Sequence, residues 1–122
     1  MRLNPDCVRD VMVFLEENLE PGFTVDEFQV IAGLAKKHSN EAEVRYSLDQ
    51  LVLDGYLEKI NTNDGIIVRN ILPPGHAFLA KAKNPAVWKG FTKISKEKGS
   101  NMAISVMSKL IQQIAEKMLG LD

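Results

Sequence analysis

The sequence contains almost no cysteine and no long apolar run, and each absence excludes a class of proteins. Cys7 is the single cysteine among 122 residues, so there is no internal disulfide, and no cysteines and histidines stand at the spacing of a zinc site. No apolar segment approaches the roughly 20 residues of a membrane-spanning helix, and residues 1–6 lack the apolar core of a signal peptide. We therefore expect a soluble cytoplasmic protein that binds no metal or other cofactor and does not enter a membrane.

Catalytic motifs are also lacking. The chain has no glycine-rich phosphate loop and none of the GxSxG, HExxH or CxxC signatures. Its acidic residues are scattered, with no second group at a fixed spacing for acid–base chemistry. We expect Cys7 to be a buried or idle thiol, because no histidine partner is indicated nearby, and His38 to be a solvated turn residue and not a ligand. The sequence thus predicts a protein that is not an enzyme and has no small-molecule substrate.

The two halves of the chain have opposite net charge, although the net charge of the whole chain is only −1. Residues 1–74 hold 7 Lys and Arg against 13 Asp and Glu, hence −6, whereas residues 75–122 hold 8 against 3, hence +5. The simplest interpretation is that each half has a solvated charged surface and that the two halves attract each other weakly. The alternative is a basic patch for a polyanion or for an acidic partner.

Residues 40–72 carry the clearest structural signal. A helix is expected over residues 40–54, with one apolar face made by Val44, Leu48, Leu51 and Val52. Gly55 then supplies a left-handed helix stop. Two segments rich in apolar and β-branched residues, 56–61 and 66–72, flank an Asp-Gly step that favours a tight hairpin. Helix, glycine stop and hairpin are the second half of a winged helix-turn-helix.

The segments before residue 40 complete this module. A helix is expected over residues 5–19, because the Asn4-Pro5 pair makes a helix start and an apolar stripe follows. Pro21-Gly22 breaks the chain. A short strand at residues 23–25, able to pair with the wing, and a helix at residues 26–37 are expected next. The three helices should pack as a trihelical core with the wing on its edge.

The predicted fold is mainly α with a small antiparallel β-wing, in the α+β class. A winged helix-turn-helix domain is expected over residues 1–83, followed by a C-terminal helical extension over residues 84–122. The last helix, expected over residues 100–119, spaces its apolar residues alternately by three and four, which keeps one seam towards a partner helix. We expect a homodimer whose interface is made by Trp88, Phe91, Ile104, Met107, Ile111, Ile114 and Met118. The alternative is that this stripe folds back on its own chain.

Several segments resemble a family of small bacterial and phage proteins of unknown function. The family pattern joins a Tyr-His-Leu helix, a wing, a GHxFL segment, a tryptophan-containing helix and an amphipathic tail. The matching segments are residues 43–48, 51–57, 75–79, 87–88 and 119–121. Ser47 stands where the pattern often has histidine, and Leu72 where it has threonine. The resemblance implies a winged-helix fold in a phage or prophage setting and implies no activity.

Two binding functions fit this fold. In the first, the protein is a DNA-binding transcriptional regulator whose helix over residues 40–54 enters a major groove. The candidate nucleic-acid contacts are Arg45, Lys59, Asn61, Asn63 and Arg69. In the second, the same fold is a protein-interaction or assembly scaffold that does not bind DNA. The fold favours the first function, whereas the net charge of −3 on that helix opposes contact with phosphates and favours the second. Lysines of the C-terminal part lined up beside the wing would support DNA binding.

Overall fold

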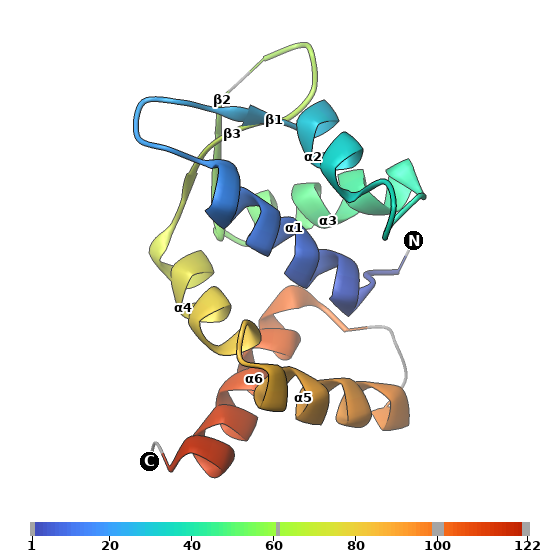
Figure 1. The fold of residues 1–122 in the computed structure, drawn as a ribbon, viewed down its shortest axis with the longest axis vertical. Coiled ribbons are helices and arrows are strands. Elements are labelled where there is room, and N and C mark those ends of the chain that lie inside the picture. The colour runs from blue at the N-terminus through green and yellow to red at the C-terminus, as the bar shows by residue number, and fades with distance from the viewer. Residues whose placement is uncertain (1, 61, 99–101, 121–122) are drawn as a thin grey trace.

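The computed structural model describes residues 2–60, 62–98 and 102–120, which are mainly helical with a small antiparallel sheet (Figure 1). The elements are α1 Pro5–Asn18, β1 Val25–Asp26, α2 Glu27–Leu34, α3 Glu41–Leu53, β2 Leu57–Ile60, β3 Ile67–Ile71, α4 Pro73–Ala82, α5 Pro85–Lys98 and α6 Ile104–Leu119. None of these helices combines the length and the apolar character that crossing a membrane would require. The predicted α+β class is confirmed.

Polar side chains fix where the three N-terminal helices begin. Asn4 accepts a first-turn backbone N–H of α1 through its side chain, as the sequence predicted. Asp26 and Gln29 form a reciprocal capping box at the start of α2. Asn40 accepts two first-turn N–H groups of α3. These caps satisfy backbone donors that have no partner inside the helix, so each start is set by its own local sequence.

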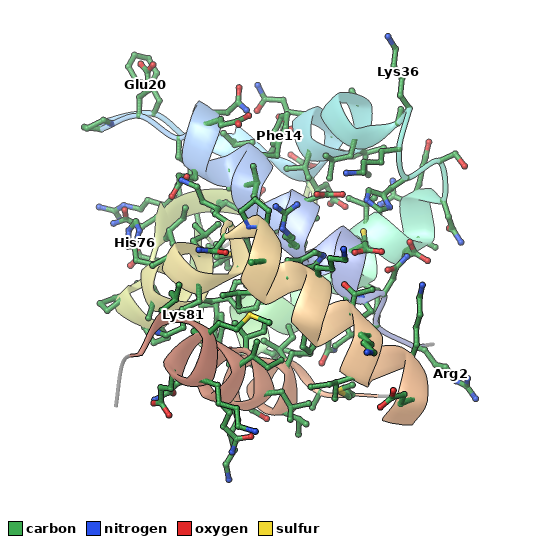
Figure 2. All side chains as sticks on the ribbon, turned by 60° about the horizontal axis from the view of Figure 1, so that its bottom comes forward. Arg2, Phe14, Glu20, Lys36, His76 and Lys81 are labelled. Atoms are coloured by element: carbon green, nitrogen blue, oxygen red, sulfur yellow. The ribbon has the colours of Figure 1, made fainter. Side chains whose placement is uncertain are left out.

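Helix α2 is shorter than the predicted 26–37. The backbone N–H groups of Lys37 and His38 both donate to the carbonyl of Leu34, at 3.1 and 2.7 Å, so the chain curls into a turn there. Phe14 projects from α1 towards α2 (Figure 2), and its ring leaves no room for a Cβ at Gly33. This close approach holds α2 against α1, and the turn then carries His38 back towards the core.

The strands form a sheet in the order β1-β3-β2, with both pairs antiparallel. The strand expected at residues 23–25 lies at Val25–Asp26 (β1). It pairs with the hairpin, and Val25 is opposite Val68. Gly55 ends α3 with φ of 79°, and Gly65 lies in the β2–β3 loop with φ of 98°. Both values are in the left-handed region, where glycine has no Cβ to clash. The predicted helix stop at Gly55 is confirmed.

Helix α1 lies at the centre of the hydrophobic core and packs against α2, α3 and α4. Three of the four side chains of the apolar face predicted for α3 are buried: Val44, Leu48 and Leu51. Val52 is only partly buried. The core face of α3 was therefore predicted correctly, apart from its edge.

Helices α5 and α6 lie at the end of the molecule away from the sheet (Figure 1). Arg9 Nε of α1 donates to the carbonyl of Ala82 at 2.8 Å, and Tyr56 forms a hydrogen bond with Ser108 of α6. The buried side chains before and after residue 83 belong to one hydrophobic cluster. The C-terminal extension therefore continues the core of the N-terminal module.

Two leucines on α3 provide a test of this core. Leu48 is fully buried, whereas Leu53 is 70% exposed. Leu48→Ala should lower the free energy of unfolding by about 2–5 kcal/mol, because it removes buried methyl groups and leaves a cavity. Leu53→Ala, the same change on the same helix, should have little effect. Urea denaturation followed by circular dichroism measures both, and equal effects at the two positions would show that the core face is wrong.

Candidate functional site

Arg45 is the single basic residue of α3, and two carboxylates hold it. Its Nε donates to Glu27 Oε2 at 2.9 Å, and its Nη2 lies 3.7 Å from Glu41 Oε2. Its guanidinium carbon also lies 5.9 Å from the centre of the Phe28 ring. This separation is within the limit of about 6 Å for a cation–π contact. The candidate DNA contact on the helix is thus already neutralised by this chain.

The other candidate nucleic-acid contacts lie on the hairpin. Lys59 on β2, Asn63 in the loop and Arg69 on β3 are exposed. Arg69 Nε lies 3.9 Å from a carboxylate oxygen of Glu58 across the two strands. Asn61 lies outside the described residues. The hairpin therefore offers exposed polar groups, but part of its positive charge is balanced within the sheet.

Glu27 joins the helices to the hairpin. Its carboxylate is buried, and its Oε1 accepts the backbone N–H of Ile66 at 3.0 Å while its Oε2 accepts from Arg45. A buried carboxylate is stable only when it is paired and hydrogen-bonded, and here both oxygens have a donor. A Cβ at Gly65 would collide with this carboxylate. Glu27 thus fixes α2, α3 and β3 relative to one another.

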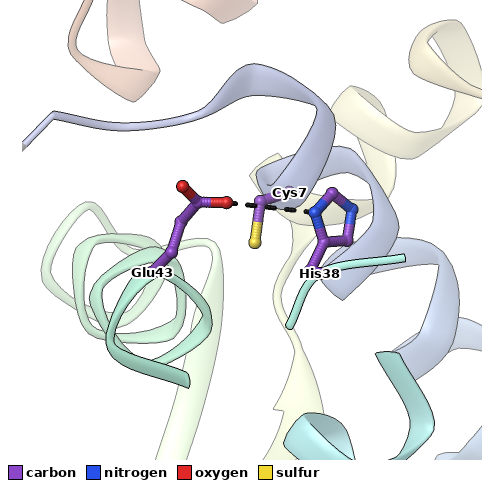
Figure 3. Close-up of side chains that lie close together, drawn as sticks. All are labelled: Cys7, His38 and Glu43. Atoms are coloured by element: carbon purple, nitrogen blue, oxygen red, sulfur yellow. Dashed lines mark ion pairs between the residues drawn. The ribbon is translucent and has the colours of Figure 1, made fainter. Parts of the chain in front are cut away.

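A second polar cluster lies where the start of α1 meets the α2–α3 loop and the first turn of α3 (Figure 3). Cys7 is fully buried, His38 is 9% exposed and Glu43 is partly buried. The Cys7 sulfur, a ring nitrogen of His38 and a carboxylate oxygen of Glu43 all lie within 4.8 Å of one another. Thiolate, imidazole and carboxylate are the groups that bind zinc in proteins, so these side chains could hold a divalent metal ion.

Asp10 orients the imidazole of His38 in this cluster. Asp10 Oδ2 lies 2.7 Å from His38 Nε2 and 3.2 Å from the Nζ of Lys37. On the other side of the ring, His38 Nδ1 lies 3.9 Å from Glu43 Oε1. An ionised carboxylate only accepts hydrogen bonds, so the hydrogen of this contact lies on Nε2. Nδ1 is then the ring nitrogen that faces Glu43.

The thiol of Cys7 is not an activated nucleophile. Its pKa is raised from 9.0 to about 11, mainly by burial, against a hydrogen bond with Ser47 that lowers it. The carboxylates of Glu43 and Asp10 contribute smaller increases to this value. With no metal bound, the thiol keeps its proton at neutral pH, and a protonated thiol is a poor nucleophile.

A family model described as Hypothetical protein (DUF2513) matches residues 2–101. The chain belongs to the DUF2513 family. The match spans α1 to α5, and therefore both polar clusters, and ends before α6 begins at Ile104. Membership of such a family is consistent with the resemblance found in the sequence. No curated protein and no solved structure matches the chain.

In this DUF2513 chain the structure corrects two expectations. His38 is a buried ring held by Asp10 and not a solvated turn residue, because the turn after α2 carries it onto α1. Cys7 has a histidine beside it after all. One signal was available: Cys7 and Asp10 are three residues apart and share the apolar face of α1, where an acid needs a buried partner. No local pattern marks His38, which follows Asp10 by 28 residues.

Most residues predicted to form a dimer interface are buried inside this chain. Four of them are at most 1% exposed: Phe91, Ile104, Met107 and Ile111. Ile114 is also buried, Trp88 Nε1 donates to Asp6 Oδ1 at 3.0 Å, and Met118 is 52% exposed. The apolar stripe of α6 packs on α4 and α5, because packing within one chain avoids the entropy cost of association. The buried members of this set are therefore not available to a second copy.

Two glycines with positive φ test the role of the Glu27 carboxylate. A Cβ at Gly65 would meet Glu27, whereas a Cβ at Gly22, whose φ is 85°, would meet nothing within 4 Å. Gly22→Ala should cost about 1 kcal/mol of stability from backbone strain alone. Gly65→Ala should cost about 1–3 kcal/mol more, since it also displaces a buried charge from its partners. Thermal unfolding of both variants checks this, and equal losses would contradict the proposed role of Glu27.

Proposed function

We propose that the protein is a non-enzymatic winged helix-turn-helix module that binds another protein. The order α1, β1, α2, α3, β2, β3 supports the winged-helix assignment, as does the position of β3 between β1 and β2. In this interpretation α3 is the helix that would read DNA in a regulator, and the β2–β3 hairpin is the wing. The phage or prophage setting and the cytoplasmic location expected from the sequence belong to the same proposal.

The observation that carries the proposal is the charge of the exposed face of α3. Arg45 is held by Glu27, while Asp49 and Asp54 are exposed with no ion pair at a described residue. Such a face repels phosphates, whose neutralisation by lysine and arginine supplies most non-specific DNA affinity. Leu53 is exposed between these acids, so the face suits a basic partner with an apolar anchor.

The lysines of α5 add no positive charge to this face. Lys89, Lys93 and Lys96 are exposed on a helix that lies at the end of the molecule away from the sheet (Figure 1). They do not line up beside the hairpin. A DNA duplex that contacted the hairpin would therefore not meet them at the same time, which supports protein binding over DNA binding.

A DNA-binding transcriptional regulator is the second candidate. The exposed Lys59, Asn63 and Arg69 on and beside the hairpin favour it, because side chains of a wing contact the sugar-phosphate backbone or the minor groove. Here the hairpin would have to supply most of the affinity, since α3 presents an acidic face. Loss of sequence-selective binding in Asn63→Ala or Arg45→Ala would support this candidate.

Fluorescence anisotropy with a labelled random duplex at low salt separates the two candidates. The wild-type protein should bind the duplex weakly or not at all. Asp49→Lys combined with Asp54→Lys should raise affinity at least about tenfold, because it replaces repulsion by phosphate contacts. Glu17→Lys combined with Glu20→Lys, exposed acids at and beyond the end of α1, is the control with the same change in net charge. Tight binding by the wild type would refute the protein-binding proposal.

We also propose that two copies associate through the part of α6 that the chain leaves uncovered. Val106, Met118 and Leu119 are exposed apolar side chains on this helix. Sedimentation of the intact chain should show a dimer, and Val106→Glu with Leu119→Glu should give a folded monomer, because charges are costly in an apolar interface. Ile111→Glu would instead unfold the chain, since Ile111 is buried in its core. A monomeric wild type would rule out the association.

A further inference from the structure

We propose that Cys7, His38 and Glu43 bind a zinc-class divalent ion that joins α1 to the start of α3. The three side chains come from the first turn of α1, the α2–α3 loop and the first turn of α3. Their donor atoms lie close together, although each side chain belongs to a different segment of the chain (Figure 3). This inference goes beyond the protein-binding proposal and does not depend on it, and it departs from the expectation of no metal that the sequence alone supports.

The separation of the donor atoms fits a tetrahedral ion after small movements. Zinc binds sulfur at about 2.3 Å and nitrogen or oxygen at about 2.0–2.2 Å, so neighbouring donors in a tetrahedral site are about 3.5 Å apart. The atoms of Cys7, His38 and Glu43 lie within 4.8 Å of one another. Side-chain shifts of about 1 Å would therefore complete three of the four zinc bonds. A water molecule would supply the fourth ligand, as in zinc sites with three protein ligands.

The surroundings of His38 are those of a metal-binding histidine. Such histidines donate the second ring N–H to a carboxylate, which fixes the tautomer and raises the basicity of the ligating nitrogen. Asp10 occupies this position, 2.7 Å from Nε2, and leaves Nδ1 on the side of Glu43. Asp10 is thus a positioning residue, which acts on the ion through His38.

The remaining groups at the cluster leave the ligands available. Asn4 Nδ2 donates at 3.0 Å to Glu43 Oε1, the same oxygen that lies 3.9 Å from His38 Nδ1. This hydrogen bond steadies the carboxylate beside the ring, and the oxygen keeps a further lone pair for the ion. The Glu43 side chain is 25% exposed, which gives the ion a route from solvent. On binding, the thiol of Cys7 releases its proton to solvent, and the thiolate and the Glu43 carboxylate together balance the two positive charges of the ion.

Cobalt(II) provides a direct test, because a thiolate bound to it gives a charge-transfer absorption band. The chain has one cysteine, so any such band reports Cys7. The intact protein, stripped of metal with a chelator, should develop the band on titration with Co²⁺ and saturate at one ion per chain. Zn²⁺ should displace the cobalt and raise the melting temperature, since an ion that binds only the folded state stabilises it. A folded wild type that shows no band would overturn the proposal.

Variants assign the remaining ligands. His38→Gln and Glu43→Gln should weaken Co²⁺ binding strongly, and Asp10→Asn should weaken it about 10- to 100-fold while the band is kept at saturation. His76→Gln is the matched control, because His76 is the other histidine and projects exposed from α4 (Figure 2). If His38→Gln fails to fold, Glu43→Gln, at the more exposed side chain, gives the decisive result. Unchanged affinity in folded Glu43→Gln, or loss of binding in His76→Gln, would overturn the assignment.

Discussion

The buried carboxylate of Glu27 is the interaction on which the N-terminal half of the molecule depends. Its two oxygens bind Arg45 of α3 and the backbone N–H of Ile66 before β3, so one side chain of α2 fixes a helix and the hairpin. Because the buried carboxylate of Glu27 needs a partner, Arg45 stays paired with it and is not available to a ligand. The same ion pair therefore holds α2 against α3 and removes a positive charge that the exposed face of α3 would need to bind DNA.

Local signals in the sequence predicted most of the elements, whereas their polar contacts could not be predicted. The caps at Asn4 and Asn40 and the stop at Gly55 act within a few residues, and the apolar stripe of α3 repeats at helical spacing. The His38–Asp10 contact joins residues 28 apart in sequence, and the Glu27–Arg45 pair joins residues 18 apart. Both contacts depend on how α2 turns back on α1, and the end of that helix is one of the boundaries that periodicity missed.

The apolar seam of α6 shows a different limit of sequence patterns. Apolar residues spaced alternately by three and four positions form a stripe that must be shielded from water. The same pattern results whether a second chain or the same chain shields it. Here α4 and α5 cover the stripe, and both Phe91 of α5 and Ile111 of α6 are buried. Opposite charge in the two halves contributes little to this docking, since Lys83–Glu16 is the one ion pair between the halves among the described residues.

The proposed ion and the proposed protein partner would contact different sides of α3. Glu43 and Ser47 are one turn apart on the side towards α1, whereas Arg45 and Asp49 are one turn apart on the exposed side. An ion at Glu43 would fix the inner side of the helix against Cys7 without changing the charge of the outer side. Metal affinity and DNA repulsion should therefore respond to different substitutions. A result that refutes one of the two proposals leaves the other standing.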